Sequence, residues 1–227
     1  MQVTIRYSIA FLLLCLLVQE AHEIAHMTAN KLLNGCGGVR YFLYWQLCDT
    51  GDKYSVVLTA FAGPLINFLF MWCGYKLLAK NTTVKEKSYG FTFIMATLPL
   101  QRLQAFVFRG SDEIIAVKKL MPSAEPFKGA AVLAGLMLIL VLMAPPLYRA
   151  FKYLEGKNKW FTILAFLFIP FFVGLIFQHL GANESIRAFL LSSPGVSQQP
   201  SWLALLDIVL LLLFIFVAKS VGNLFTR

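Results

Sequence analysis

Long apolar stretches recur along the chain, and they are the feature that most limits how it can fold. Each is close to the ~20 residues that an α-helix needs to cross the hydrocarbon core of a bilayer. The stretches are continuous rather than alternating every second residue, and lipid offers the backbone no hydrogen-bonding partners, so helices are the expected spanning form. They cover roughly residues 7–33, 54–79, 129–151, 160–180 and 202–219, with a weaker stretch at 88–108.

The composition of the chain is also that of a membrane protein. Hydrophobic residues make up 59% of it and charged residues 14%, with a mean hydropathy of +0.71. These values lie outside the range of ordinary soluble domains. We therefore predict an all-α, multi-pass integral membrane protein, a polytopic helical bundle of five to six spans with a short β-hairpin after the first helix. The first stretch lacks a small-residue cleavage pattern, so we expect it to remain in the mature protein.

The net charge of +9 comes from Lys and Arg residues that lie mostly in the short connections between apolar stretches. Membrane proteins keep basic residues there as topology signals and as contacts to anionic headgroups. We therefore expect the lipid bilayer, and no nucleic acid, as the partner of these charges.

The segment after the first apolar stretch has a different character. Residues 34–35, Asn-Gly, are typical of a helix end. Residues 39–47 are rich in aromatic residues and strand formers, and a turn follows at 49–52. This pattern predicts a β-hairpin or an interfacial segment, whose aromatic residues either form a belt at the membrane surface or hold an extended substrate. Cys36 and Cys48 flank the segment, and we expect unpaired thiols at both.

Between residues 88 and 122 the pattern is mixed. The apolar stretch is interrupted by Pro99 and by polar residues such as Arg102, and it breaks before Asp112. Ser111 is a suitable N-cap for a new helix that starts with acidic residues. A broken helix at membrane depth is tolerated only where it packs against protein or lines a polar cavity. This break is therefore a candidate wall of a functional site.

The pattern His22-Glu23-Ile24-Ala25-His26 lies late in the first apolar stretch. Two histidines four residues apart share one face of a helix, at the spacing needed to bind a single Zn²⁺. Glu23 is placed to act as the general base, because bound zinc lowers the pKa of a water to about 7. Ionisable groups inside a span are costly, so we prefer metal binding to a pair of hydrogen-bonded core histidines.

A catalytic zinc ion takes three protein ligands, so one more must come from elsewhere in the chain. Asp112 is our choice, because it follows the chain break and belongs to no surface run of charges. Glu113 is its rival, and either acid could instead serve only the helix N-terminus. His179, at the end of a later span, is a further imidazole, but a lone histidine near an interface more often faces solvent.

The sequence Gly63-Pro64-Leu65-Ile66-Asn67 opens or bends the second span. Asn67 brings an amide to a depth where each polar group needs a partner. This amide could bind the backbone of an extended substrate or hold an oxyanion. Equally, Gly63 could serve helix packing and Asn67 an internal hydrogen bond.

Taken together, these motifs resemble the site-2 protease family of intramembrane zinc metalloproteases. The resemblance covers about residues 8–122 and rests on the HExxH pattern in the first membrane helix, on residues 62–67, Ala-Gly-Pro-Leu-Ile-Asn, in the next, and on Asp112 after a later break. The family usually has a glycine after this aspartate and prolines shortly before it. Here Glu113 follows, and the nearest upstream proline, Pro99, is distant.

The resemblance implies a zinc cofactor and a role for each matching residue. It assigns the general base to Glu23, a substrate or transition-state contact to Asn67, and zinc ligation to His22, His26 and Asp112. It also implies a membrane-associated β segment after the HExxH helix and, as the setting, a bacterial cytoplasmic (inner) membrane.

We therefore expect a zinc endopeptidase that hydrolyses peptide bonds of membrane-spanning or membrane-adjacent proteins, as in regulated intramembrane proteolysis. Its partners would be a transmembrane protein or peptide substrate and a separate regulatory membrane protein. One alternative is a zinc peptidase acting at the membrane surface, with Glu113 or Glu184 as third ligand. Another is a non-catalytic metal-binding scaffold, for which Glu23 would be unnecessary.

The motifs divide the chain into two parts. Residues 1–128 form the expected catalytic membrane core, with the HExxH helix, the hairpin, the GPxxN helix and the broken segment that bears the aspartate. Residues 129–227 carry no such motif and are expected to form three accessory transmembrane helices.

Overall fold

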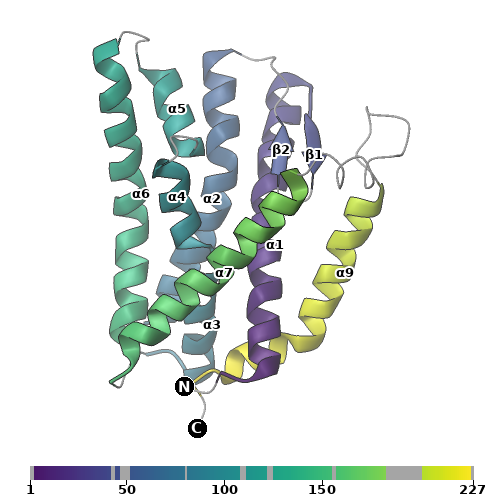
Figure 1. Cartoon of the computed structure of the whole chain (residues 1–227), viewed down its shortest axis with the longest axis vertical. Helices are drawn as coiled ribbons and strands as arrows, with labels where there is room; N and C mark the ends of the chain where they lie inside the picture. Colours follow the sequence, from purple (N-terminus) through teal and green to yellow (C-terminus); the bar gives the residue numbers. More distant parts are fainter. Residues whose placement is uncertain are drawn as a thin grey trace.

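The computed structural model of the chain describes residues 3–41, 44–46, 52–79, 81–107, 111–121, 125–154, 157–182 and 201–225. Within these residues, long helices form a bundle with two short strands near one end (Figure 1). In chain order the elements are α1 (Ile5–Asn34), β1 (Val39–Tyr41), β2 (Tyr44–Gln46), α2 (Lys53–Leu77), α3 (Val84–Ala96), α4 (Pro99–Val107), α5 (Asp112–Leu120), α6 (Glu125–Tyr153), α7 (Lys159–Ala182), α9 (Ser201–Val217) and the 3₁₀ helix η1 (Ala218–Asn223).

Five helices of the described part are long and apolar enough to cross a membrane, judged by length and composition. They are α1, α2, Gly129–Tyr153 of α6, Lys159–Ile176 of α7, and Ala204–Asn223 across α9 and η1. Only 28%, 22% and 11% of the apolar windows of the last three are buried inside the protein. Exposed apolar surface of this extent fits lipid rather than water. The prediction of a helical bundle with at least five spans of membrane length is confirmed.

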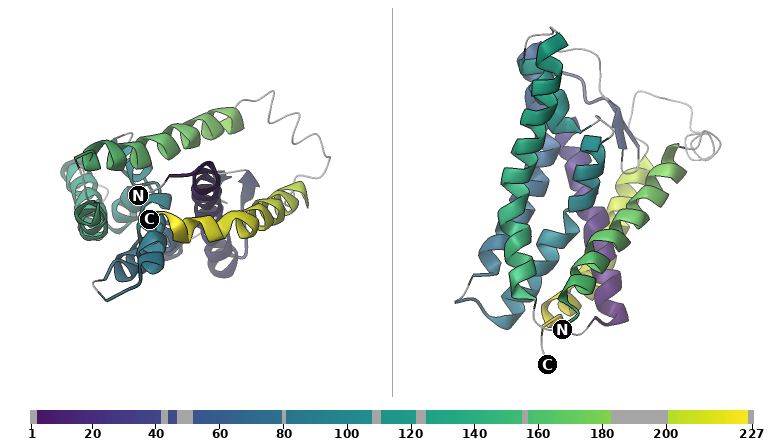
Figure 2. Two further views of the ribbon diagram at one scale, coloured as in Figure 1. Left: turned by 90° about the horizontal axis from the view of Figure 1, so that it is seen from below. Right: turned by 60° about the vertical axis from the view of Figure 1, so that its left-hand side comes forward.

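The weaker sixth stretch is divided among three short helices. α3, α4 and α5 follow one another from the end of the bundle where both termini lie toward the opposite end (Figures 1 and 2). Together they cross the bundle once, which explains how both chain ends lie at the same end although five continuous helices traverse it. Leu98, with a left-handed φ of 53°, separates α3 from α4, and Pro99 begins α4. α4 ends before residue 108 and α5 begins at Asp112, so the predicted break before this residue is confirmed.

Local capping explains where the helices nearest the motifs begin and end. α1 starts after Thr4, whose hydroxyl accepts a backbone N–H, and stops at Gly35, whose φ of 71° is unstrained only for glycine. α5 starts after Ser111, whose hydroxyl accepts the N–H of Ile114 at 3.3 Å, as predicted. This cap fixes Asp112 as the first residue of its helix.

The segment after α1 contains a short antiparallel pairing. β1 and β2 are three residues each, with Val39 opposite Gln46. The residues that would join them, 42–43, and the predicted turn region 47–51 lie outside the described residues, so a complete hairpin stays a prediction. Cys36 is disulfide-bonded, and the expectation of an unpaired thiol at this position is therefore wrong.

Two glycines bring α2 and α3 into direct backbone contact. A Cβ added at Gly74 would lie 2.5 Å from the carbonyl oxygen of Gly90, and one added at Gly90 would lie 2.7 Å from the carbonyl oxygen of Gly74. Small residues at helix interfaces in membranes allow this close approach, which strengthens dispersion contacts. The pair therefore fixes the position of α3, the first part of the broken passage.

Replacing Gly90 by Ala should destabilise the protein by about 1–3 kcal/mol, because the added methyl group overpacks a backbone contact that cannot move aside. The measurement is the thermal unfolding midpoint of the detergent-solubilised protein. Gly129→Ala is the matched control, since a Cβ there meets no atom within 4 Å. An equal or higher midpoint for Gly90→Ala would show that α3 does not need this contact.

Candidate metal centre

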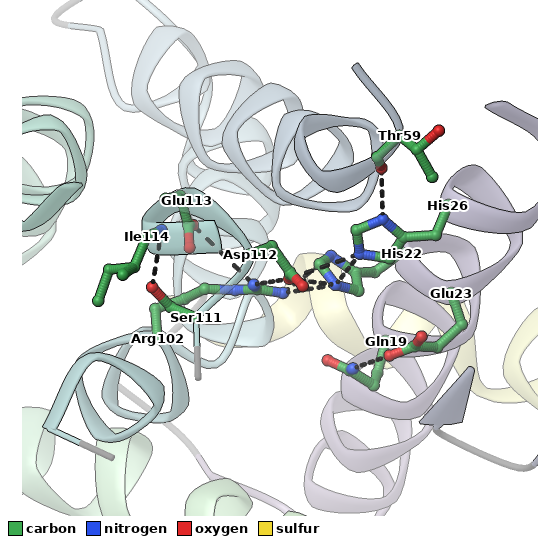
Figure 3. A network of polar contacts seen from close by, with 10 residues as sticks. All are labelled: Gln19, His22, Glu23, His26, Thr59, Arg102, Ser111, Asp112, Glu113 and Ile114. Carbon is green, nitrogen blue, oxygen red and sulfur yellow. Dashed lines mark hydrogen bonds and ion pairs between the residues drawn. The ribbon is translucent and has the colours of Figure 1, made fainter. Parts of the chain in front are cut away.

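Two histidines of α1 and one aspartate of α5 bring their side chains together (Figure 3). Nε2 of His22 lies 3.0 Å from Nε2 of His26, and Oδ2 of Asp112 lies 3.3 Å from the first and 3.4 Å from the second. Among the described residues, these three form a group whose potential ligand atoms all lie within 4.8 Å of one another. The side chains of both histidines are 3% exposed and that of Asp112 is 28% exposed.

The three separations fit the ligand set of a tetrahedral metal ion. With metal–ligand bonds of ~2.0–2.1 Å, tetrahedral ligands lie about 3.3–3.4 Å apart. Both His–Asp separations agree with this spacing, and the His–His separation is slightly shorter. Imidazole and carboxylate are also donors that catalytic zinc sites use. The residue types and spacing are therefore compatible with Zn²⁺, and the fold brings together the three residues that the sequence analysis named as candidate ligands.

The main chain of α2 fixes the orientation of His26. Nδ1 of this ring lies 2.7 Å from the carbonyl oxygen of Thr59. A carbonyl only accepts, so Nδ1 donates its proton and Nε2 of the neutral ring keeps its lone pair toward Asp112. Thr59 was not predicted as a site residue, because it contributes through its backbone rather than through its side chain.

Gly63 makes this approach of α2 to the histidines sterically feasible. A Cβ at Gly63 would collide with Nε2 of His26 and would lie 2.5 Å from Cε1 of His22. No side chain fits in that space without displacing both rings. Of the two roles considered for this glycine, close helix packing is therefore the one that the structure supports.

The two acids at the start of α5 have different surroundings. Oδ2 of Asp112 lies 3.3 Å from Nε2 of His22, 3.4 Å from Nε2 of His26 and 3.1 Å from Nη1 of Arg102. Glu113 is 0% exposed, and its Oε1 lies 3.9 Å from Nη1 of Arg102. Its carboxylate is not part of the cluster formed by the two histidines and Asp112. The structure thus separates the preferred third ligand from its rival.

Arg102 of α4 is the site residue to which the sequence analysis gave no role. Its Nη1 lies 3.1 Å from Oδ2 of Asp112, and its Nη2 lies 2.8 Å from Nδ1 and 3.1 Å from Nε2 of His22. The side chain is 8% exposed. Charged residues at membrane depth are rare and usually functional, and that signal could have drawn attention to Arg102.

Asn67 lies against the same arginine. With its amide oriented so that Oδ1 faces the guanidinium group, Oδ1 accepts from Nη2 of Arg102 at 2.8 Å and from Nε at 3.2 Å. This contact is the internal hydrogen bond that we considered for Asn67 alongside a substrate contact. The residue is 3% exposed, and its oxygen already has a partner.

Glu23 projects from α1, the helix that also carries the two histidines (Figure 3). It is 8% exposed, and its Oε1 accepts from Nε2 of Gln19 at 2.9 Å. Because Gln19 lies one helical turn earlier on the same face, it restrains the carboxylate without help from another helix. The same spacing argument that identified the histidines could have identified Gln19.

The cluster also has a hydrogen-bonded form that needs no metal. Arg102 can donate to Nδ1 of His22, Nε2 of that ring to Nε2 of His26, and Nδ1 of His26 to the carbonyl of Thr59. Every step of this chain pairs one donor with one acceptor. The geometry is therefore compatible with a metal site and with a polar network, and only binding measurements separate them.

Other predicted ligands lie outside what the structure describes, namely the side chain of His179 and all of Glu184. Comparison with family models, curated proteins and solved structures found no match to the chain. The resemblance to the site-2 protease family therefore rests on the sequence motifs alone.

Replacing Gly63 by Ala should lower the zinc content of the purified protein, because the methyl group displaces the rings of both His22 and His26. Zinc would be measured by elemental analysis after dialysis against metal-free buffer. Gly129→Ala serves as control and should keep the zinc content of the wild type. Full zinc in a folded Gly63→Ala protein would mean that the metal is bound elsewhere.

Proposed function

We propose that the protein is an intramembrane zinc endopeptidase that hydrolyses peptide bonds of membrane-spanning or membrane-adjacent proteins. The observation that supports this most is the convergence of His22, His26 and Asp112 within 4.8 Å, with Glu23 on the helix of the two histidines. These residues come from two elements that are far apart in sequence. Ligands for a metal and a carboxylate base on one helix face are what metal-assisted hydrolysis requires.

Each residue has one task in this proposal. His22, His26 and Asp112 would hold Zn²⁺, which when bound would supply Lewis acidity to a peptide carbonyl and to water. Glu23 takes a proton from the attacking water and delivers it to the leaving amine. Gln19 holds the Glu23 carboxylate in place through its 2.9 Å hydrogen bond.

The substrate must offer an extended peptide bond, because a helical one is hydrogen-bonded within its own helix and covered by side chains. The strands β1 and β2 lie close to the end of α1 that carries the site (Figure 1). A strand edge there would replace the backbone hydrogen bonds that a substrate loses on unwinding. We propose this segment as the place where the unwound part of a transmembrane substrate pairs.

The membrane setting is supported by the five apolar helices. The disulfide at Cys36 favours a non-cytoplasmic position for the nearby end of α1, since disulfides persist in oxidising compartments. The chain termini would then face the cytoplasm. A bacterial cytoplasmic membrane and a regulatory partner remain expectations from the family resemblance.

A non-catalytic scaffold is the second candidate. It is favoured by the contacts of Arg102, which complete a hydrogen-bonded network without a metal. It gives no reason for the buried carboxylate of Glu23 beside the histidines. A surface peptidase with a glutamate as third ligand has less support, because Glu113 lies outside the cluster.

Glu23→Gln should keep stoichiometric zinc and lose cleavage by roughly 10²–10⁴-fold, because the amide cannot accept the proton from water. Asp112→Asn should lose zinc as well as cleavage. Both are compared with wild type by elemental analysis and by cleavage of co-expressed single-span substrates. Glu86→Gln is the control, since this exposed acid caps α3 and glutamine can do the same.

The outcomes separate the candidates. A well-folded wild type without zinc would remove the central claim. Zinc in the wild type together with unchanged cleavage by Glu23→Gln would exclude Glu23 as the base.

A further inference from the structure

Arg102 contacts the same atoms that would bind the metal, and the inference drawn from this rests on the proposed zinc site. Its Nη1 lies 3.1 Å from Oδ2 of Asp112, the oxygen that also faces both histidines. Its Nη2 lies 3.1 Å from Nε2 of His22, the nitrogen that faces His26 and Asp112. Two of the three ligand atoms are therefore also partners of the guanidinium group.

A guanidinium group and a metal ion cannot share these partners. Arginine has only donors, so a ring nitrogen that it contacts through hydrogen bonding must present a lone pair. Neutral imidazole has one such lone pair, and metal ligation of His22 would use it. Two cations beside one carboxylate oxygen of Asp112 also repel each other strongly at a site shielded from water.

Arg102 cannot avoid this conflict by losing its proton, because the guanidinium group stays charged in proteins. Its side chain is 8% exposed, so solvent is not a ready alternative partner. A buried charge needs another partner nearby if it is to leave Asp112. The surroundings of Arg102 provide one.

Glu113 is that partner. Its side chain is 0% exposed, and neither of its carboxylate oxygens makes a hydrogen bond of ordinary geometry to the described residues, although the Ser111 hydroxyl and its own backbone N–H are nearby. Glu113 follows Asp112 in the chain, and its Oε1 lies 3.9 Å from Nη1 of Arg102 (Figure 3). A buried carboxylate without hydrogen bonds is costly, and a small rotation of the guanidinium group would satisfy it.

Asn67 keeps the arginine within reach of both acids. Its Oδ1 accepts from Nε and Nη2 of Arg102. The bond to Nε restrains the inner part of the guanidinium group, which limits a move of Nη1 to the short path between Asp112 and Glu113.

The charges also balance in the second arrangement. Arg102 and Glu113 would neutralise each other, and a divalent cation would be neutralised by Asp112 and Glu23. Buried charges are tolerated when they are paired in this way.

We propose that Arg102 is a built-in competitor for the metal, which pairs with Asp112 in the absence of a divalent cation and moves to Glu113 when His22 and Asp112 bind one. Arg102 is thus a positioning residue that sets metal affinity. Glu113 is its acceptor in the metal-bound protein.

The test measures the dissociation constant for Zn²⁺ of the full-length, detergent-purified protein, by competition with a chromophoric chelator. Arg102→Gln should bind zinc about 5- to 150-fold more tightly, which is the usual range of coupling between two competing equilibria. Its unfolding midpoint in EDTA should fall, because the carboxylates of Asp112 and Glu113 lose their cation. A purely structural role for Arg102 would weaken zinc binding instead.

Glu113→Gln should weaken zinc binding, because the displaced arginine then has no charged acceptor. In the double variant Arg102→Gln with Glu113→Gln, this weakening should disappear, because there is then no displaced guanidinium group that needs an acceptor. Arg149→Gln is the matched control, as this arginine donates to the carbonyl of Tyr75 on a different part of α2. Its zinc affinity should equal that of the wild type.

The proposal is overturned if Arg102→Gln binds zinc no more tightly than wild type, or if Glu113→Gln weakens binding equally with and without Arg102. The cycle isolates the coupling between the two side chains from their separate effects on folding. Zinc binding without this coupling would leave the zinc peptidase standing and remove only the competitor. Coupling without Glu23-dependent cleavage would support the competitor role of Arg102 and remove the zinc peptidase. If no variant binds zinc, both proposals fail.

Discussion

Polar groups inside a bundle of apolar helices must satisfy one another, because lipid supplies no hydrogen bonds. This constraint organises the upper half of the bundle in Figure 1, where α1, α2, α4 and α5 each contribute a polar group to one cluster. The histidines of α1 face an aspartate from α5, a carbonyl from α2 and an arginine from α4. Each of these helices is held in position by the hydrogen bonds that it donates to, or accepts from, the others.

The break in the third passage follows from the same constraint. In a continuous helix, the helical repeat alone would determine the direction in which Asp112 faces. Instead, Leu98 adopts a left-handed conformation, Pro99 begins α4, and Ser111 caps α5. These features put the first residue of α5 beside α1. Irregular backbone is tolerated at this depth because protein surrounds it.

The sequence was sufficient for features with a local cause. Helix spacing alone identified His22 and His26, and capping chemistry identified the end of α1 and the start of α5. The proximity of Asp112 to the histidines needed the resemblance as well, because residues separated by two strands and three helices share no periodic pattern. The contact of Arg102 with these residues had no local signal beyond its charge. The prediction of an unpaired thiol at Cys36 was wrong, because whether two cysteines pair depends on their distance in the fold, which sequence spacing does not determine.

Glu113 illustrates how a departure from a family pattern acquires meaning only in three dimensions. In the sequence it replaces the glycine that the resemblance expects and therefore counts against the motif. In the structure its buried carboxylate lies 3.9 Å from the guanidinium group of Arg102, so the negative charge that replaces the glycine has a positive charge nearby. A pair of this kind leaves the formal charge of the site unchanged.

Gly63 has a consequence for the route by which a polypeptide could reach the cluster. It allows α2 to press against both imidazoles, which leaves no width between α1 and α2 for a second chain. Asp112, at 28% exposure, is the most accessible of the three clustered side chains, so the cluster is most accessible beside the first turn of α5. An intact helix is about 10–12 Å across with its side chains. Entry beside this turn would therefore select incoming chains by how readily they unwind, and would favour segments rich in glycine or proline over uniformly apolar helices.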